Sequence, residues 1–281
     1  MIPYSDLLTA SVPAADHVYS YGSDPLQFGE LRMPSGSAKV PLVVFIHGGC
    51  WQAQYDIRHS AGAARALADD GFAVWSVEYR RVGNNSGGWP GTFDDIAHAV
   101  DYVRTLATDN PRLDTSRVVL MGHSAGGQLA LWAASRRQGE MNGLFISSTR
   151  PLAIAGVVSL AGITDLAAYG AQAGGCNSAV TPLMGGTAQE EPARYRAVNP
   201  IERPVLDVPV HLVHGESDPI VPLSQSRDFA ARTPSSVLVV VPGAGHFDMI
   251  APQSTAWPFV LQAAHAIADG PAVPRVHTGN E

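Results

Sequence analysis

The apolar residues of this chain follow two alternating patterns, short β-branched runs and longer stretches with helical spacing. Short continuous runs are typical of parallel strands, because helices bury both faces of a parallel sheet. The alternation therefore predicts an α/β protein with a mostly parallel central sheet flanked by helices. The runs cover residues 41–46, 72–77, 117–121, 153–160, 208–213 and 236–241.

Two further segments, residues 17–21 and 26–32, precede these runs and are separated by the turn-forming sequence Gly-Ser-Asp-Pro. They predict an antiparallel hairpin at the sheet edge, for a total of about eight strands. A chain of 281 residues can form one such domain, which we place at residues 1–268. Residues 269–281 carry no pattern and predict a flexible tail.

Residues 92–107 have the spacing of a surface helix. Asp94 and Asp95 fall in its first turn, where the helix dipole favours carboxylates. Residues 165–209 differ, because glycine pairs and prolines interrupt any period between two predicted parallel strands. An insertion of this length predicts a small lid or cap.

Charge narrows the classes of partner. The net charge is −7 and there is no basic run, whereas nucleic acid and anionic membranes favour clustered Lys and Arg. The start of the chain lacks the pattern of a secretory signal, and no apolar run reaches membrane-spanning length. We expect a soluble, cytoplasmic protein with no nucleic-acid or membrane partner. The oligomeric state, including a homodimer, is left open.

The two cysteines, Cys50 and Cys176, lie far apart and match no metal-ligand spacing. We expect free thiols, with a single disulfide as the open alternative.

A candidate nucleophile lies in the sequence Gly122-His-Ser124-Ala-Gly126, which fits the pattern G-x-S-x-G. An apolar strand precedes it and a strong helix-forming stretch follows, which is the strand–turn–helix order that this motif requires. Glycines permit the tight turn that exposes the Ser124 hydroxyl. The alternative is a glycine-rich turn in which the serine only caps a helix.

A serine hydroxyl needs a base within hydrogen-bond reach, and histidine titrates in the useful range. His246 is favoured because it follows the last predicted strand and so lies at the carboxyl end of the sheet. His214 also ends a strand, but a role in shaping the next loop is favoured. His265 falls in a helical stretch, and His123 should point away from the hydroxyl of Ser124.

Asp218 is the candidate acid, in a loop after the penultimate strand. The chain order is then Ser, Asp, His. Glu216 in the same loop and Asp165 after the preceding strand remain alternatives, as does an ordinary turn-forming role for Asp218.

The sequence His-Gly-Gly-Cys-Trp at residues 47–51 follows a predicted strand, where oxyanion donors are expected. We predict that the backbone N–H groups of Gly49, Cys50 and Ala125 form the oxyanion hole. A glycine turn packed by Trp51 is the alternative, and the two interpretations are compatible.

Together these motifs resemble the α/β-hydrolase superfamily over residues 40–265. Within it, the HGGxW form, the sequence Glu-Tyr-Arg-Arg at 78–81 and Trp-Pro-Gly-Thr-Phe-Asp-Asp at 89–95 are similar to the kynurenine formamidase (arylformamidase) and related carboxylesterase branch. The resemblance implies a triad of Ser124, Asp218 and His246 and a small ester or aryl-formamide substrate. Cys50 stands where such relatives often have glycine, alanine or an aromatic residue.

The expected activity is therefore a serine hydrolase that works through an acyl-enzyme, with no metal or organic cofactor. Two rivals remain, a ligand receptor on the same fold and a lipase. Whether Trp51, Trp89, Tyr169 and Cys176 line the pocket depends on how residues 165–209 fold.

Overall fold

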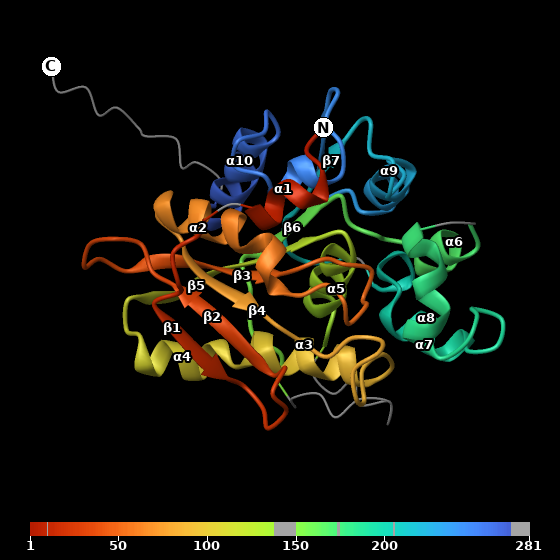
Figure 1. The fold of residues 1–281 in the computed structure, drawn as a ribbon, viewed down its shortest axis with the longest axis horizontal. Helices are drawn as coiled ribbons and strands as arrows, with labels where there is room; N and C mark the ends of the chain where they lie inside the picture. Colours follow the sequence, from red (N-terminus) through yellow and green to blue (C-terminus); the bar gives the residue numbers. More distant parts are fainter. Residues whose placement is uncertain (10, 138–149, 173–174, 205, 271–281) are drawn as a thin grey trace, which may run out of the picture.

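The computed structural model describes residues 1–9, 11–137, 150–172, 175–204 and 206–270. These residues form one eight-stranded sheet in the order β1-β2-β4-β3-β5-β6-β7-β8 (Figure 1). Six neighbouring strands are parallel, and β1 and β2 form the expected antiparallel hairpin at one edge. The predicted α/β class and strand number are confirmed. The strands are β1 (His17–Ser20), β2 (Phe28–Arg32), β3 (Val40–Ile46), β4 (Ala73–Val77), β5 (Leu113–His123), β6 (Gly156–Leu160), β7 (Val210–Gly215) and β8 (Ser236–Val241).

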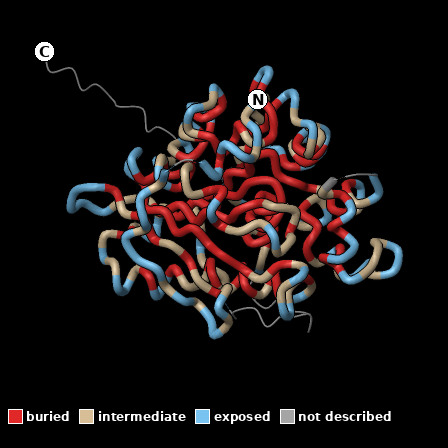
Figure 2. The backbone as a smooth tube through the Cα atoms, in the orientation of Figure 1, coloured by how far each residue is buried: buried red, intermediate tan, exposed pale blue. Residues whose placement is uncertain are grey.

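Helices cover both faces of the sheet, and two hydrophobic clusters result. Alternate residues of β3 enter opposite clusters, Val43 and Phe45 on one face and Val44 and Ile46 on the other, as the period of a strand requires. Figure 2 shows the buried residues concentrated along the central strands. The first face is covered by α1 (Tyr4–Thr9), α2 (Ala61–Asp69) and α10 (Trp257–Ala268), and the second by α3 (Gly91–Asp101), α4 (Val103–Asp109), α5 (Ala125–Ala134) and α9 (Ser224–Arg232).

The helix predicted at residues 92–107 is present as two helices, α3 and α4, which meet at Tyr102. The expectation that Asp95 serves the helix dipole at the surface is wrong. Its side chain is fully buried and pairs with Arg80, whose Nε lies 2.9 Å from Oδ2. A buried carboxylate needs a charged partner, and only the tertiary fold brings this arginine to it.

The predicted insertion at residues 165–209 connects β6 to β7 and packs beside α5 (Figure 1, green to cyan). Its helices are tied to the body of the protein: the Gln128 side-chain amide donates to the Val198 carbonyl at 3.0 Å, and the Trp89 N–H donates to the Leu183 carbonyl at 2.7 Å. Its elements are α6 (Leu166–Gly170), η2 (Gly175–Ala179), α7 (Val180–Met184), α8 (Pro192–Val198) and η3 (Pro200–Glu202). Of the predicted tail, residues 271–281 lie outside the described residues.

The expectation of free thiols is wrong. Cys50 and Cys176 form a disulfide, with their Cα atoms 5.1 Å apart, a normal separation for such a bond. Their separation of 126 positions in the sequence hid the pair from any spacing argument, because the fold alone brings the loop after β3 against the insertion.

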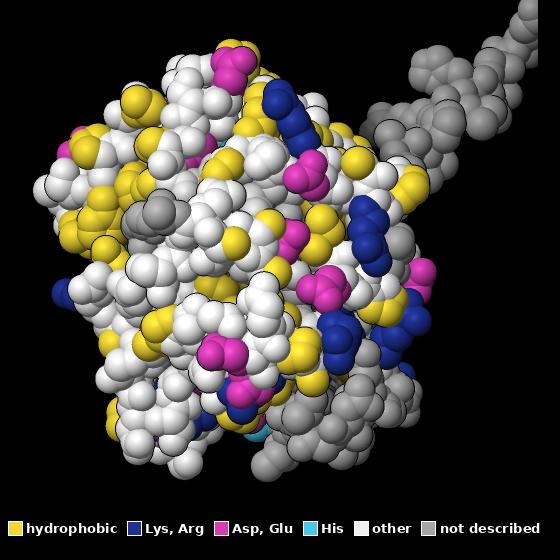
Figure 3. All heavy atoms as spheres, turned by 90° about the vertical axis from the view of Figure 1, so that its right-hand side faces the viewer, with side chains coloured by type: hydrophobic (Ala, Val, Ile, Leu, Met, Phe, Trp, Pro, Cys, Tyr) yellow, Lys and Arg dark blue, Asp and Glu magenta, His cyan; other side chains and the backbone are white. Residues whose placement is uncertain are grey.

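Two features of the structure concern the expectation of no nucleic-acid or membrane partner. On the face drawn in Figure 3, acidic and basic side chains are scattered and form no broad basic patch. Among the described residues, no helix combines the length and the apolar character needed to cross a membrane.

Candidate active site

Ser124 sits at a sharp turn between β5 and α5, with φ +57° and ψ −119°. This backbone conformation is rare for a residue with a side chain and is strained. The flanking glycines have a steric reason: a Cβ on Gly122 would lie 2.1 Å from the Gly126 carbonyl oxygen, and one on Gly126 would lie 2.1 Å from the Ile46 carbonyl oxygen. The turn therefore needs both glycines of the motif.

His246 and Asp218 are hydrogen-bonded to each other, with 2.7 Å between Nδ1 and Oδ2. The second carboxylate oxygen of Asp218 accepts the N–H groups of Ile220 at 2.8 Å and Val221 at 2.9 Å. The side chain of Asp218 is fully buried, and that of His246 is only 3% exposed. The carboxylate is thus held by the backbone and in turn orients the imidazole.

Electrostatics favour an ionised carboxylate at this position. Burial alone would raise the pKa of Asp218, but hydrogen bonds from His214, His246 and the Val221 N–H outweigh it, so the pKa lies well below its ordinary value. An ionised Asp218 accepts the Nδ1–H of His246. In the neutral ring this leaves Nε2 as the unprotonated nitrogen, which is the one able to take a proton.

A cavity of about 170 Å³ brings four of the six predicted site residues together: Gly49, Cys50, Ser124 and His246 all line it. Asp218 lies behind His246, outside the cavity wall. Ala125 is buried at the start of α5, next to the serine.

The amides predicted as oxyanion donors come from two segments that meet at this cavity. Gly49 and Cys50 have φ of +103° and +54°, so the chain turns sharply after β3. Ala125 is the first residue of α5, where N–H groups lack partners within the helix. Among the described residues, these three amides donate to no backbone carbonyl, so their N–H groups are available.

The rival site residues have other partners. Glu216 is exposed and accepts from the Gly243 N–H at 3.4 Å. Asp165 caps α6 through the Ala168 N–H at 3.0 Å. His214 lies 2.8 Å from the Ser226 hydroxyl and 3.5 Å from the Asp218 carboxylate, on the side away from the cavity.

Two further histidines, His123 and His59, form part of the cavity wall. The Nε2–H of His123 donates to the His246 carbonyl at 3.0 Å rather than to the Ser124 hydroxyl. Burial lowers the pKa of His123 well below its usual value, and burial together with the nearby charge of His47 lowers that of His59 to about 3. Both rings are therefore uncharged at physiological pH and line the cavity as neutral groups.

Sequence reasoning missed a buried network beneath the loop that carries Gly49 and Cys50. His47 Nε2 lies 3.1 Å from the Glu78 carboxylate, which also pairs with Arg81. The other oxygen of Glu78 accepts the Ile57 N–H at 3.1 Å, and the Tyr79 hydroxyl donates to the His47 carbonyl at 2.9 Å. The Glu-Tyr-Arg-Arg segment at residues 78–81 carries this network in the sequence. It supported the family resemblance but was not recognised as part of the site.

The first helix, α1, was also missed. The Tyr4 ring lines the cavity and lies 5.6 Å from the Tyr55 ring and 5.5 Å from the Phe247 ring, between centroids. The Ile2 N–H donates to the Asp248 carboxylate at 3.0 Å, beside the His246 loop. Only one short amphipathic turn marks α1 in the sequence, so no local pattern points to this role.

Of the four residues left open, Cys176 lines the cavity and the other three do not. Trp51 is buried and donates to the Gln128 side chain at 3.2 Å, and the Tyr169 hydroxyl donates to the Ile220 carbonyl at 3.1 Å. As for metals, no group of three or more His, Cys, Asp or Glu side chains in the described ranges could hold an ion.

Comparison with known proteins assigns the family. The model of the BD-FAE family matches residues 30–233, which include Ser124, Asp218 and both segments of the predicted oxyanion hole. The chain belongs to the BD-FAE family. The match ends before His246.

The relatives of this BD-FAE chain include esterases. It is 26% identical to Esterase LipC of Mycobacterium tuberculosis over 88% of this chain, but it spans only 62% of that protein. Esterase B from Lactobacillus Rhamnosis has a similar structure, with a TM-score of 0.76 and 23% identity over 94% of this chain and 90% of the other. A truncated carbohydrate esterase from gut microbiota has a TM-score of 0.73 and 22% identity over 90% and 99%. The structural matches show the α/β-hydrolase fold.

Proposed function

We propose that this BD-FAE protein is a serine carboxylesterase with Ser124 as nucleophile, His246 as general base and Asp218 as the residue that orients the base. One observation carries the proposal. Ser124 and His246 line one small cavity, and the 2.7 Å hydrogen bond that the His246 Nδ1–H donates to Asp218 fixes the histidine in the tautomer that can accept the serine proton. Esterases among the relatives support the reaction class.

In the proposed reaction, His246 takes the proton of Ser124 and the alkoxide attacks the ester carbonyl. The amides of Gly49, Cys50 and Ala125 stabilise the oxyanion, and one such donor typically contributes about 3 kcal/mol to lowering the barrier. Collapse of the tetrahedral intermediate expels the alcohol, which takes a proton from His246. Water then attacks the acyl-enzyme by the same steps and releases the acid.

The cavity of about 170 Å³ favours short acyl groups over long ones, which argues against a lipase. Aryl-formamide cleavage is the second candidate. The HGGxW form and segments 78–81 and 89–95 support it, and formyl is the smallest acyl group that this cavity could take. Turnover of N-formylkynurenine no faster than that of simple aryl esters would remove the formamidase candidate.

We further propose that the insertion at residues 165–209 acts as a small cap on the cavity, since Cys176 of this segment lines it. A cytoplasmic location stays a prediction. The disulfide counts against it, because such bonds persist mainly in oxidising compartments. The sequence left the oligomeric state open, with a homodimer as one alternative.

A Ser124→Ala variant tests the proposal. We expect the kcat for p-nitrophenyl acetate to fall by about 10³-fold or more, and labelling by a fluorophosphonate probe to be lost. Thermal unfolding of both proteins provides the control for folding. Equal inertness of the wild type and the variant toward both reagents would instead favour the receptor alternative.

A further inference from the structure

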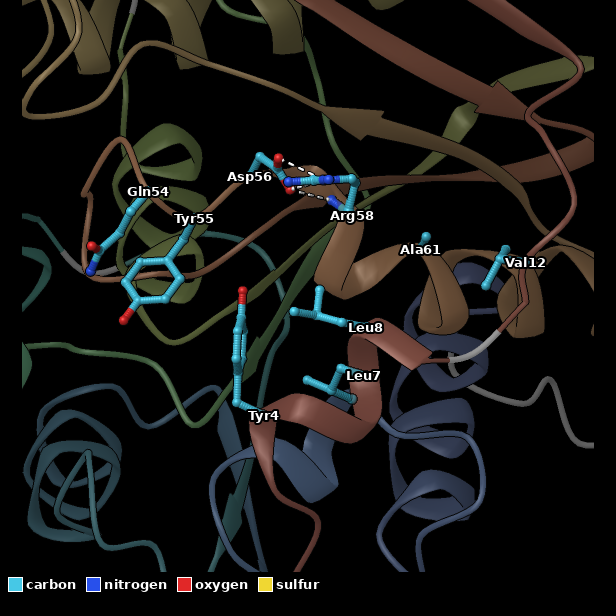
Figure 4. A pocket seen from close by; sticks show the side chains of 9 residues that line it. All are labelled: Tyr4, Leu7, Leu8, Val12, Gln54, Tyr55, Asp56, Arg58 and Ala61. Carbon is cyan, nitrogen blue, oxygen red and sulfur yellow. Dashed lines mark hydrogen bonds and ion pairs between the residues drawn. The ribbon is translucent and has the colours of Figure 1, made fainter.

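A second, larger hollow of about 660 Å³ lies beside the catalytic cavity, between α1 and the chain segment that leads into α2 (Figure 4). Tyr4 and Tyr55 line both spaces. In Figure 4 the two tyrosines lie to the left of Leu7 and Leu8 of α1, and the Leu8 side chain points toward them. The groove therefore adjoins the cavity that holds Ser124, and the two tyrosines lie between the two spaces.

The two spaces differ in size in a way that matters for a substrate. Sites for drug-sized ligands usually measure about 300–1,000 Å³, so the groove alone falls in that range and the catalytic cavity falls below it. A substrate larger than a simple acyl ester must extend beyond the cavity. The groove beyond Tyr4 and Tyr55 offers room for that extension.

The chemistry of the groove is amphiphilic and close to neutral. Leu7 and Leu8 of α1 form an apolar wall, and Leu8 is 51% exposed, one of few large hydrophobic side chains exposed on the described surface. Opposite them, Asp56 and Arg58 pair with each other at 2.8 Å, so their charges offset. Gln54 supplies an uncharged amide. These walls suit an apolar ring and offer no net charge to an ionic ligand.

The position of the groove indicates which half of an ester it would hold. Tyr4 lies against Phe247, the residue after His246, and His246 delivers the proton to the departing alcohol. Cys176 of the insertion and Ile220 of the loop that carries Asp218 line other parts of the cavity. Through Tyr4 the groove lies beside the loop that carries His246, the residue from which the alcohol takes its proton.

We propose that this groove is a binding site for the leaving alcohol of the substrate, and that it takes an uncharged alcohol bearing an aromatic ring. The proposal rests on the esterase function proposed above, with Tyr4, Tyr55 and Leu8 as residues that determine specificity. The ring would pack on Leu8 and against the edges of the two tyrosines that face the groove.

Two isomeric esters test the site: 2-phenylethyl acetate carries the ring on the alcohol, and ethyl phenylacetate carries it on the acyl group. Ethyl acetate is the reference without a ring, and a pH-stat measures acid release from all three. We expect kcat/KM for 2-phenylethyl acetate to exceed that for ethyl acetate by about tenfold or more, because a ring is buried. Ethyl phenylacetate should show no such gain.

Two variants localise the effect. Leu8→Asp should lower the ratio of kcat/KM for 2-phenylethyl acetate over ethyl acetate by about fivefold to tenfold, and Leu8→Trp should lower it by filling the groove. Val237→Asp is the matched control, since Val237 is 49% exposed and lines neither space. This control should leave the ratio of the wild type unchanged. Melting temperatures of all variants report on folding.

The failures are distinguishable. No preference for 2-phenylethyl acetate, or a preference that both Leu8 variants retain, overturns the alcohol site while ethyl acetate turnover leaves the esterase intact. A larger gain with ethyl phenylacetate overturns the assignment to the alcohol side. A preference for acetylated glucose over 2-phenylethyl acetate, abolished by Leu8→Asp, overturns the aromatic character of the alcohol. Turnover of ethyl acetate that survives Ser124→Ala contradicts the esterase proposal itself.

Discussion

Cys50, whose amide is a proposed oxyanion donor, is bonded through a disulfide to Cys176 of the insertion between β6 and β7. Both residues line the cavity that holds Ser124. The bond therefore fixes the wall formed by the insertion to the loop that follows β3. Neither the loop nor the insertion can move away from the cavity independently of the other.

Loss of this disulfide should destabilise the protein. We expect Cys176→Ser to lower the free energy of unfolding in urea by about 2–4 kcal/mol, because a cross-link over a long loop restricts the unfolded chain. The Cys50→Ser/Cys176→Ser double variant should be no less stable than the single variant. The wild type in excess dithiothreitol should approach both. Identical urea midpoints for oxidised wild type and variant would contradict a disulfide in solution.

Asp218→Asn should lower kcat by about 10³–10⁴-fold. An asparagine can still accept the Ile220 and Val221 N–H groups, but its amide nitrogen cannot accept the Nδ1–H of His246. The histidine then loses the tautomer that deprotonates Ser124. Steady-state kinetics with p-nitrophenyl acetate measure the loss.

The rival acids supply matched controls for this experiment. Glu216→Gln and Asp165→Asn make the same chemical change at carboxylates that do not line the cavity and are bonded to other partners than the His246 ring. We expect both variants to stay within about threefold of the wild type in kcat. A larger loss in either variant than in Asp218→Asn would transfer the acid role to that residue.

Acid should destabilise the protein partly through Glu78. Burial raises the pKa of this carboxyl, but the charge and hydrogen bond of His47 and the charge of Arg81 outweigh burial and lower the pKa from 4.5 to about 2. A carboxyl with a lowered pKa stabilises the folded state fully above about pH 4.5 and loses that contribution as the pH falls toward 2. The shift corresponds to about 3 kcal/mol.

Urea unfolding at a series of pH values measures this dependence. Glu78→Gln should be less stable than the wild type at pH 7, but its stability should decline less steeply between pH 4.5 and pH 2. His59 acts in the same direction at higher pH, because its pKa of about 3 means that the unfolded state binds a proton first as the pH falls below 6.5. Parallel curves for the wild type and Glu78→Gln would show that Glu78 does not titrate as described.

Gly126→Ala should cost about 3 kcal/mol or more in stability, or prevent folding. The new Cβ would lie 2.1 Å from the Ile46 carbonyl oxygen, and backbone cannot yield as a flexible side chain can. Gly62→Ala is the control within another helix, where the nearest atom outside the helix lies 4.0 Å from the new Cβ. That change should stabilise by about 0.5–1 kcal/mol. Thermal unfolding compares them, and equal melting temperatures would contradict the steric account of the turn.

Local residue patterns were sufficient for the framework of the site. Apolar runs located the strands because burial on both faces leaves a continuous signal along each strand. The glycines around Ser124 predicted the turn, since the steric demand acts between near neighbours in the chain. The parallel order of the strands then predicted that the loops bearing Asp218 and His246 meet Ser124 at one edge of the sheet.

Features that depend on contacts between distant segments could not be predicted in this way. Asp95 looked like a helix-terminal carboxylate, yet it is buried against Arg80. Nothing near Cys50 indicates that Cys176 will reach it, and nothing in the weak helix around Tyr4 indicates that it borders the cavity. Such contacts depend on how the finished sheet and helices pack against each other.

The sequence by itself therefore determined the fold class, the turn that presents Ser124 and the chain order of the proposed triad, because each follows from periodicity or from steric demands within a few residues. Only the tertiary structure decided the disulfide, the network under the loop that carries Gly49 and Cys50, and the groove beside α1. Those features arise where segments separated by many residues come into contact. Such contacts form only when the helices pack on the two faces of the sheet.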